Sequence, residues 1–326
     1  MAAHVICIIG MHRSGTSMVA GLLQRCGLYL GPENQLLGAN SGNPDGHFEH
    51  REFFRIDDAL LQHLGGSWDF PPSLKSAWEQ DASLEGLRQD AEALVAGFSG
   101  KSPWGWKEPR TTILLPFWKS IVPQLRFVIC VRSPLEVAQS LAKRNKLPIE
   151  QGVLLWHRYM RAAIQDTERC ARFFAYHEDF FAAPEAQTQA LIDFCGLKRP
   201  SDFSIEAAGI RRELWHQRCE ISELLTADSI PSEYKLLYVG LRALSGQRNV
   251  STMPTDSSAT DVSEFLRLID NLHDHQQVVR LQAELTEKNN ELFKLRTEIL
   301  KELKKNHRWA YRFYRNFIRP FRVRHP

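Results

Sequence analysis

The sequence lacks closely spaced cysteines. No CxxC pair occurs among its six cysteines, which are scattered along 326 residues as Cys7, Cys26, Cys130, Cys170, Cys195 and Cys219. A zinc framework and a disulfide scaffold both need cysteines in matched spacings, so neither is indicated. We therefore expect the chain to work in a reducing compartment.

Long hydrophobic runs are missing as well. The apolar run within the first ten residues, MAAHVICIIG, is too short to cross a bilayer and lacks the basic flank and cleavage site of a signal peptide. These features predict a cytoplasmic protein. Because 43% of the residues are hydrophobic, the chain can bury one large core, and we expect one main domain with an appendage.

Acidic residues are absent after Glu302, where basic and aromatic residues interleave over 304–326. The eight basic residues are Lys304, Lys305, Arg308, Arg312, Arg315, Arg319, Arg322 and Arg324, and the aromatic ones are Trp309, Tyr311, Phe313, Tyr314, Phe317 and Phe321. Removing these eight from the 41 basic residues leaves 33 against 38 acidic ones, a mildly acidic remainder. Such a basic aromatic tail can lie peripherally at an anionic inner membrane surface; a solvated terminus or a coiled-coil partner face is the alternative. No nucleic-acid module is recognisable, so no nucleic-acid partner is expected.

Two short β-branched runs, at 5–9 and 127–131, are each followed directly by a helical pattern. This is typical of buried parallel strands in βα units, and a weaker run lies at 173–176. The helix after the second run opens with Ser133-Pro134-Leu135-Glu136, which predicts a capping box with proline at the first helical position. We expect an α/β fold with a P-loop-like, mainly parallel sheet flanked by helices, and a ligand at the carboxyl ends of the strands.

The composition changes after Gly246. Residues 247–261 are polar and turn-prone, which predicts a flexible linker after a main domain at 1–246. Over 262–303, heptad a and d positions hold Val278, Leu281, Leu285, Leu292, Leu295 and Ile299, with Lys288 as a polar exception. This pattern predicts a coiled-coil helix, through which the chain can form a homo-oligomer.

The residues after the first strand run form the most informative motif. Gly10-Met11-His12-Arg13-Ser14-Gly15-Thr16-Ser17 lies between a strand and a helix, a geometry that turns backbone N–H groups toward an anion. The GxxxxG spacing is that of a P-loop, yet Thr16 follows where a nucleotide triphosphatase has lysine. Arg132 ends the second strand run where such an enzyme needs an acidic residue for Mg²⁺. Both departures point away from triphosphate chemistry and from a metal ion.

The loop resembles that of the sulfotransferase family, in which Arg13, Ser14, Gly15, Thr16 and Ser17 would bind the 5′-phosphosulfate of 3′-phosphoadenosine-5′-phosphosulfate. The family's second motif, an arginine at a strand end and a serine on the next helix, is matched by Arg132 and Ser140, which would bind the 3′-phosphate. The resemblance covers roughly residues 5–180 and makes 1–246 a sulfotransferase domain. It does not extend to the family's nucleotide-clamping loop.

Sulfonate transfer to an alcohol needs a base and positive charge near the transferred group. Glu49, between His47 and His50, is the candidate base, with the two histidines as alternatives; several bacterial and Golgi sulfotransferases are similar in this respect. The stretch Lys107-Glu108-Pro109-Arg110 resembles a motif of the same relatives in which Lys107 stabilises charge. Because a residue before proline avoids helical geometry, we expect this stretch at a strand end facing the cleft.

Two further groups near these motifs are given no catalytic role. Arg110 can bind the acceptor or pair with Glu108, and both assignments stay open. His177-Glu178-Asp179 corresponds to a stretch that shapes the cleft wall in the family, which implies a structural role. Taken together, the motifs predict transfer of sulfonate to a hydroxyl acceptor.

The acceptor is not encoded in a recognisable motif, and analogy favours a glycan or a lipid. A P-loop small-molecule kinase and a non-catalytic coiled-coil scaffold with a degenerate nucleotide domain are the rival interpretations. The missing lysine and magnesium carboxylate argue against the kinase, and the presence of Glu49 and Lys107 argues against the scaffold.

Overall fold

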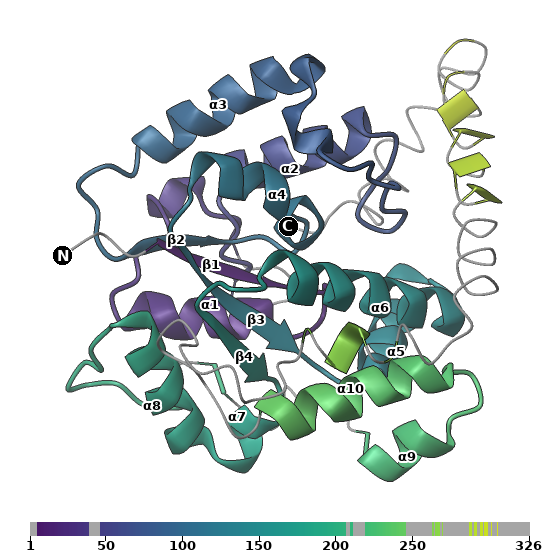
Figure 1. Ribbon diagram of the computed structural model, residues 1–326. Coiled ribbons are helices and arrows are strands. Elements are labelled where there is room, and N and C mark those ends of the chain that lie inside the picture. Colours follow the sequence, from purple (N-terminus) through teal and green to yellow (C-terminus); the bar gives the residue numbers. More distant parts are fainter. Residues whose placement is uncertain are drawn as a thin grey trace.

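The computed structural model describes residues 5–38, 46–206, 209–210 and 219–245, together with isolated positions between 263 and 305 (Figure 1). Its centre is a parallel sheet in the order β2-β1-β3-β4. The strands are β1 (Val5–Gly10), β2 (Trp104–Lys107), β3 (Leu125–Val131) and β4 (Arg172–Tyr176). The register places Cys7 of β1 beside Trp106 of β2 and Phe127 of β3. All three runs identified in the sequence are therefore strands of one sheet.

Helices cover both faces of the sheet (Figure 1). They are α1 (Thr16–Arg25), α2 (Arg51–His63), α3 (Glu85–Ala96), α4 (Thr111–Ile121), α5 (Pro134–Asn145), α6 (Ile149–Asp166), α7 (Asp179–Ala182), α8 (Pro184–Cys195), α9 (Ile221–Thr226) and α10 (Ser232–Ser245). Because side chains alternate along a strand, Ile6 and Ile8 of β1 pack with α1, α7 and α8, whereas Cys7 and Ile9 pack with α2, α4 and α6. The predicted α/β fold with a parallel sheet between helical layers is confirmed.

The start of α5 corrects one prediction. Ser133 is the N-cap residue and Pro134 opens the helix, but the Ser133 side chain makes no capping hydrogen bond. Glu136 instead accepts from Arg132 Nε at 2.5 Å and from the backbone N–H of Cys219 at 2.9 Å. The predicted capping box is wrong because a buried guanidinium is a stronger partner for the carboxylate than a backbone N–H.

Little of the C-terminal prediction falls on described residues. The linker at 247–261 lies outside them. The tail at 304–326 also lies outside them, apart from Lys305, and so do the apolar heptad positions, apart from Leu295. Leu295 is helical and 56% exposed. Nearer the domain, Leu266 and Ile269 are buried in the core cluster that includes α10. Among the described residues, no helix is long and apolar enough to cross a membrane.

Candidate active site

Two glycines shape the loop between β1 and α1. A Cβ atom at Gly10 would lie 2.4 Å from the carbonyl oxygen of Cys130 in β3, and one at Gly15 would lie 2.8 Å from the His177 ring. Gly15 also has a φ of 86°, a left-handed conformation that favours glycine. The loop therefore passes close to the ends of β3 and β4, where α1 begins.

Arginines from distant parts of the chain meet at this loop. Arg13 Nε donates to Ser140 Oγ of α5 at 2.9 Å, and Arg132 Nη1 donates to the carbonyl oxygen of Arg13 at 3.2 Å. Burial, reinforced by the charges of Arg144 and Arg132, lowers the pKa of Arg13 to about 10. The structure thus brings Arg13, Arg132 and Ser140 together, and gathered positive charge of this kind favours a bound anion.

Glu49 and Lys107 form a buried ion pair beside the same loop. The Lys107 ammonium, 1% exposed, donates to Glu49 Oε1 and, at 3.2 Å, to Ser17 Oγ. Burial raises the pKa of Glu49 to about 7, although the neighbouring ammonium acts to lower it. Among the described residues, Glu49 Oε2 is buried without a hydrogen-bond partner. This carboxylate can accept a proton near neutral pH, where a general base is most effective.

The two histidines that flank Glu49 have different surroundings. His47 Nδ1 lies 3.9 Å from Glu49 Oε2, and burial together with the charge of Lys107 lowers the pKa of His47 to about 3. His50 caps α2 by accepting from the N–H of Glu52 at 3.3 Å, and its ring packs against Phe53 and Phe98. His47 is therefore a weak base, and His50 has a structural contact of its own.

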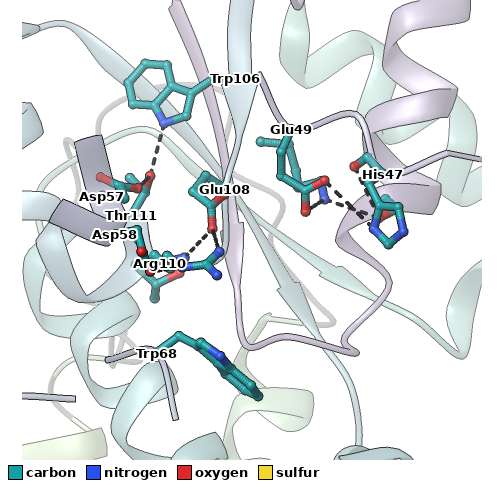
Figure 2. A network of polar contacts seen from close by, with 12 residues as sticks. His47, Glu49, Asp57, Asp58, Trp68, Trp106, Glu108, Arg110 and Thr111 are labelled. Carbon is teal, nitrogen blue, oxygen red and sulfur yellow. Dashed lines mark hydrogen bonds and ion pairs between the residues drawn. The ribbon is translucent and has the colours of Figure 1, made fainter. Parts of the chain in front are cut away.

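A second buried network lies next to this pair (Figure 2). Arg110 Nη1 donates to Glu108 Oε1 at 2.8 Å, and its Nε lies 3.6 Å from Asp58. Behind them, the buried Asp57 accepts from Thr111 Oγ1 at 2.5 Å and from Trp118 Nε1 at 2.6 Å. Lys107 is thus the last residue of β2 and Glu108-Pro109-Arg110 follow it, as expected for a strand end, and Arg110 pairs with Glu108.

A model of the sulfotransferase family matches residues 6–201 of the chain. The chain belongs to the sulfotransferase family. The matched region contains the loop cluster of Arg13, Arg132 and Ser140 and also the buried Glu49–Lys107 pair. No curated protein matches the chain.

Solved structures similar to this sulfotransferase are distant in sequence. The sulfotransferase STF9 from Mycobacterium avium is 15% identical, with 68% of this chain and 70% of that chain covered and a TM-score of 0.42. The sulfotransferase domain of the Synechococcus PCC 7002 olefin synthase is 16% identical, with 82% and 94% covered and a TM-score of 0.41. The sulfotransferase domain from the curacin biosynthetic pathway is 12% identical, with 83% and 98% covered and a TM-score of 0.40.

In this sulfotransferase, Arg13 of the loop and the Glu49–Lys107 pair border a small cavity of about 40 Å³. Its lining consists of His12, Arg13, Thr16, Ser17, His47, Glu49, Phe54, Lys107, Pro109, Arg110 and Arg144. Two of these, Phe54 and Arg144, were not identified from the sequence, and His12 was named in the loop motif without a role. Arg144 could have been found, because it lies four residues after Ser140 on the same face of a helix. His12 packs its ring 4.5 Å from that of Trp68, a contact with no local sequence signal.

The stretch after β4 contacts α10. The Tyr238 hydroxyl of α10 donates to Glu178, and Arg242 Nη1 donates to Asp179 Oδ1 at 2.7 Å. His177 lies against Gly15 of the loop. These contacts agree with a structural role for all three residues. Among the described residues, no group of three His, Cys, Asp or Glu is placed to hold a metal ion.

Proposed function

We propose that this sulfotransferase transfers the sulfonate group of 3′-phosphoadenosine-5′-phosphosulfate to a hydroxyl group of a glycan or a lipid, without a metal ion. The observation that carries the proposal is the buried Glu49–Lys107 pair, which adjoins Ser17 of the anion-binding loop. A base and a cation beside such a loop suit the transfer of an anionic group to an alcohol.

The residues around the loop fit this donor. Ser14 Oγ is buried and finds no hydrogen-bond partner in the described part of the chain, so a further acceptor at the loop would satisfy it. Ser14, Arg13 and the N-terminus of α1 would hold the 5′-phosphosulfate, with Gly15, Thr16 and Ser17 completing the loop, while Arg132 and Ser140 would hold the 3′-phosphate. When bound, the donor supplies a sulfonate whose sulfur bonds to the acceptor oxygen as its bond to the 5′-phosphate oxygen breaks.

Glu49 and Lys107 would then supply the base and the positive charge that the transfer needs. Glu49, with a pKa of about 7, takes the proton from the acceptor hydroxyl. The Lys107 ammonium is held between Glu49 and Ser17, at the loop that would receive the sulfonate, and stabilises negative charge there. A sulfonate carries less charge than a γ-phosphoryl group, so these groups can suffice where kinases use Mg²⁺.

The two-anion donor site predicts a strong nucleotide preference. Isothermal titration calorimetry should show adenosine-3′,5′-bisphosphate binding about ten- to 100-fold more tightly than 5′-AMP, with no need for Mg²⁺, because a charge-assisted contact contributes about 1.5–3 kcal/mol. Arg132→Ala should remove most of that preference. Equal affinity for the two nucleotides, or Mg²⁺-dependent binding with ATP preferred, would overturn the proposed function.

The environment of Glu49 predicts the pH dependence of activity. The base acts when it is ionised, and burial raises its pKa to about 7, so kcat/KM should rise with pH up to about 7 and then level off. His47→Asn should keep this rise, since the pKa of His47, about 3, lies far below that range. Initial rates between pH 5.5 and 8.5 test this, and a flat profile would show that Glu49 is not the base.

A further inference from the structure

Arg144 is a cation at the active-site cavity to which the proposed chemistry gives no role. It lies in the last turn of α5, one helical turn after Ser140, and lines the cavity together with Glu49 and Lys107. The side chain is half-buried. Its charge acts on Arg13 of the loop and on His47 beside Glu49, because it contributes to the lowered pKa of each. Arg144 is thus close to the base as well as to the loop.

The other cations of the site have partners. Lys107 pairs with Glu49, Arg110 with Glu108, and Arg132 with Glu136, while Arg13 donates to Ser140. By contrast, within the part of the chain that the structure describes, Arg144 makes neither a hydrogen bond nor an ion pair. Burial lowers its pKa, and the charge of Glu49 opposes this only in part. A partly desolvated guanidinium with unused donors favours an oxyanion ligand.

The donor already has partners for both of its anionic ends. In the proposed function the loop around Arg13 holds the 5′ end, and Arg132 with Ser140 holds the 3′ end. Arg144 and Glu49 line the same small cavity, so a hydroxyl group placed at Glu49 brings the neighbouring atoms of the acceptor within reach of Arg144. The guanidinium is therefore placed to contact the acceptor.

Resting on the proposed function, we propose that the acceptor carries an oxyanion, a carboxylate, phosphate or sulfate, next to the hydroxyl that is sulfonated, and that Arg144 binds it. Arginine suits this role because its planar donors match a carboxylate or phosphate in two parallel hydrogen bonds. Arg144 would then select anionic glycans or lipids over neutral ones of the same shape, and it would fix the hydroxyl relative to Glu49.

The test compares matched probes on the full chain saturated with adenosine-3′,5′-bisphosphate. Ligand-observed NMR titrations would use p-nitrophenyl β-D-glucuronide against the glucoside, and 3-hydroxyoctanoate against its methyl ester. In at least one pair the anionic probe should bind about ten- to 100-fold more tightly to the native protein, as expected for one charge-assisted contact. Arg144→Gln should bind both members of that pair equally, and Arg144→Lys should keep part of the preference.

Lys143→Gln is the matched control, because Lys143 is the exposed neighbour on the same helix. It removes the same charge and should leave the preference unchanged. Native protein that shows no anionic preference in either pair overturns the proposal. So does Arg144→Gln that keeps the preference, or that instead loses more than tenfold in affinity for adenosine-3′,5′-bisphosphate, since Arg144 would then serve the donor.

Failure of the proposed function is a separate result. It would appear as native protein that does not bind adenosine-3′,5′-bisphosphate better than 5′-AMP. The glucuronide and glucoside titrations can be repeated without nucleotide in that case. An Arg144-dependent preference for the anion would then still identify Arg144 as an anion-binding residue. If that preference is absent too, both the proposed function and the proposed role of Arg144 are overturned.

Discussion

Replacing Glu49 with glutamine is expected to lower turnover by roughly 10²–10⁴-fold, the usual effect of removing a general base. The amide keeps the shape of the side chain but cannot accept the hydroxyl proton. Affinity for adenosine-3′,5′-bisphosphate should not fall, because the substitution removes a negative charge beside an anion-binding loop. Single-turnover transfer from sulfur-labelled donor, combined with calorimetry of the bisphosphate, measures both quantities.

The histidines provide the controls for this experiment. His50→Asn should keep turnover, because asparagine can replace the N-cap contact with the N–H of Glu52. His47→Asn should lower turnover much less than Glu49→Gln, because His47 has a pKa of about 3 and is a weak base. If Glu49→Gln turned over normally and His47→Asn did not, His47 would be the base and our assignment to Glu49 would be wrong.

The elements that hold the donor motifs could be predicted from the sequence because their signals are local. The run at 5–9, the glycines of the loop and the helix that follows are contiguous, and they form β1, the loop and α1. Arg132 ends a β-branched run in the same way. In parallel sheets the strand ends gather at one edge, so Arg13 and Arg132 could be expected near each other before any contact was known.

Burial of the acids could not be predicted from local patterns. Glu49 precedes α2, where an exposed acid would be equally favourable, and its partner Lys107 lies 58 residues further along the chain. Asp57 lies on the buried face of α2 with Phe53 and Leu61, but the partners that satisfy its carboxylate there, Thr111 and Trp118 of α4, lie 54 and 61 residues further along the chain. These outcomes depend on which elements pack together.

The capping-box prediction at the start of α5 was wrong for the same reason. Ser133 and Glu136 have the spacing of a capping box, and spacing alone gives no information about competing partners. The strand that precedes the helix places the Arg132 guanidinium next to Glu136, and the carboxylate binds it at 2.5 Å. The Arg132–Glu136 pair also orients the arginine that we assign to the 3′-phosphate.

Replacing Lys107 with methionine is expected to lower turnover by roughly 10²–10³-fold, the effect of removing one donor that stabilises developing negative charge. The substitution also leaves Glu49 buried without its cation, and breaking such a pair can cost about 3–5 kcal/mol of stability. A loss of activity at one pH therefore has two possible causes, which must be separated.

The pH dependence of stability separates them. Burial already raises the pKa of Glu49 above its ordinary value, and loss of Lys107, which acts to lower it, must raise it further. The folded protein holds a proton that the unfolded chain releases, and the native protein shares the resulting loss of stability up to about pH 7. The stability deficit of Lys107→Met relative to the native protein therefore opens above about pH 7 and is small below it. Denaturant unfolding at pH 5.5 and pH 8 measures this difference.

Two further variants distinguish lost charge stabilisation from lost protein stability. Lys107→Met combined with Glu49→Gln should recover stability at pH 8, because no buried carboxylate is left without a partner. Lys107→Arg keeps the charge and should retain more turnover than Lys107→Met at every pH. If Lys107→Met turned over within threefold of the native protein at a pH where both are equally stable, the lysine would serve to hold Glu49 and would not stabilise the transferred group.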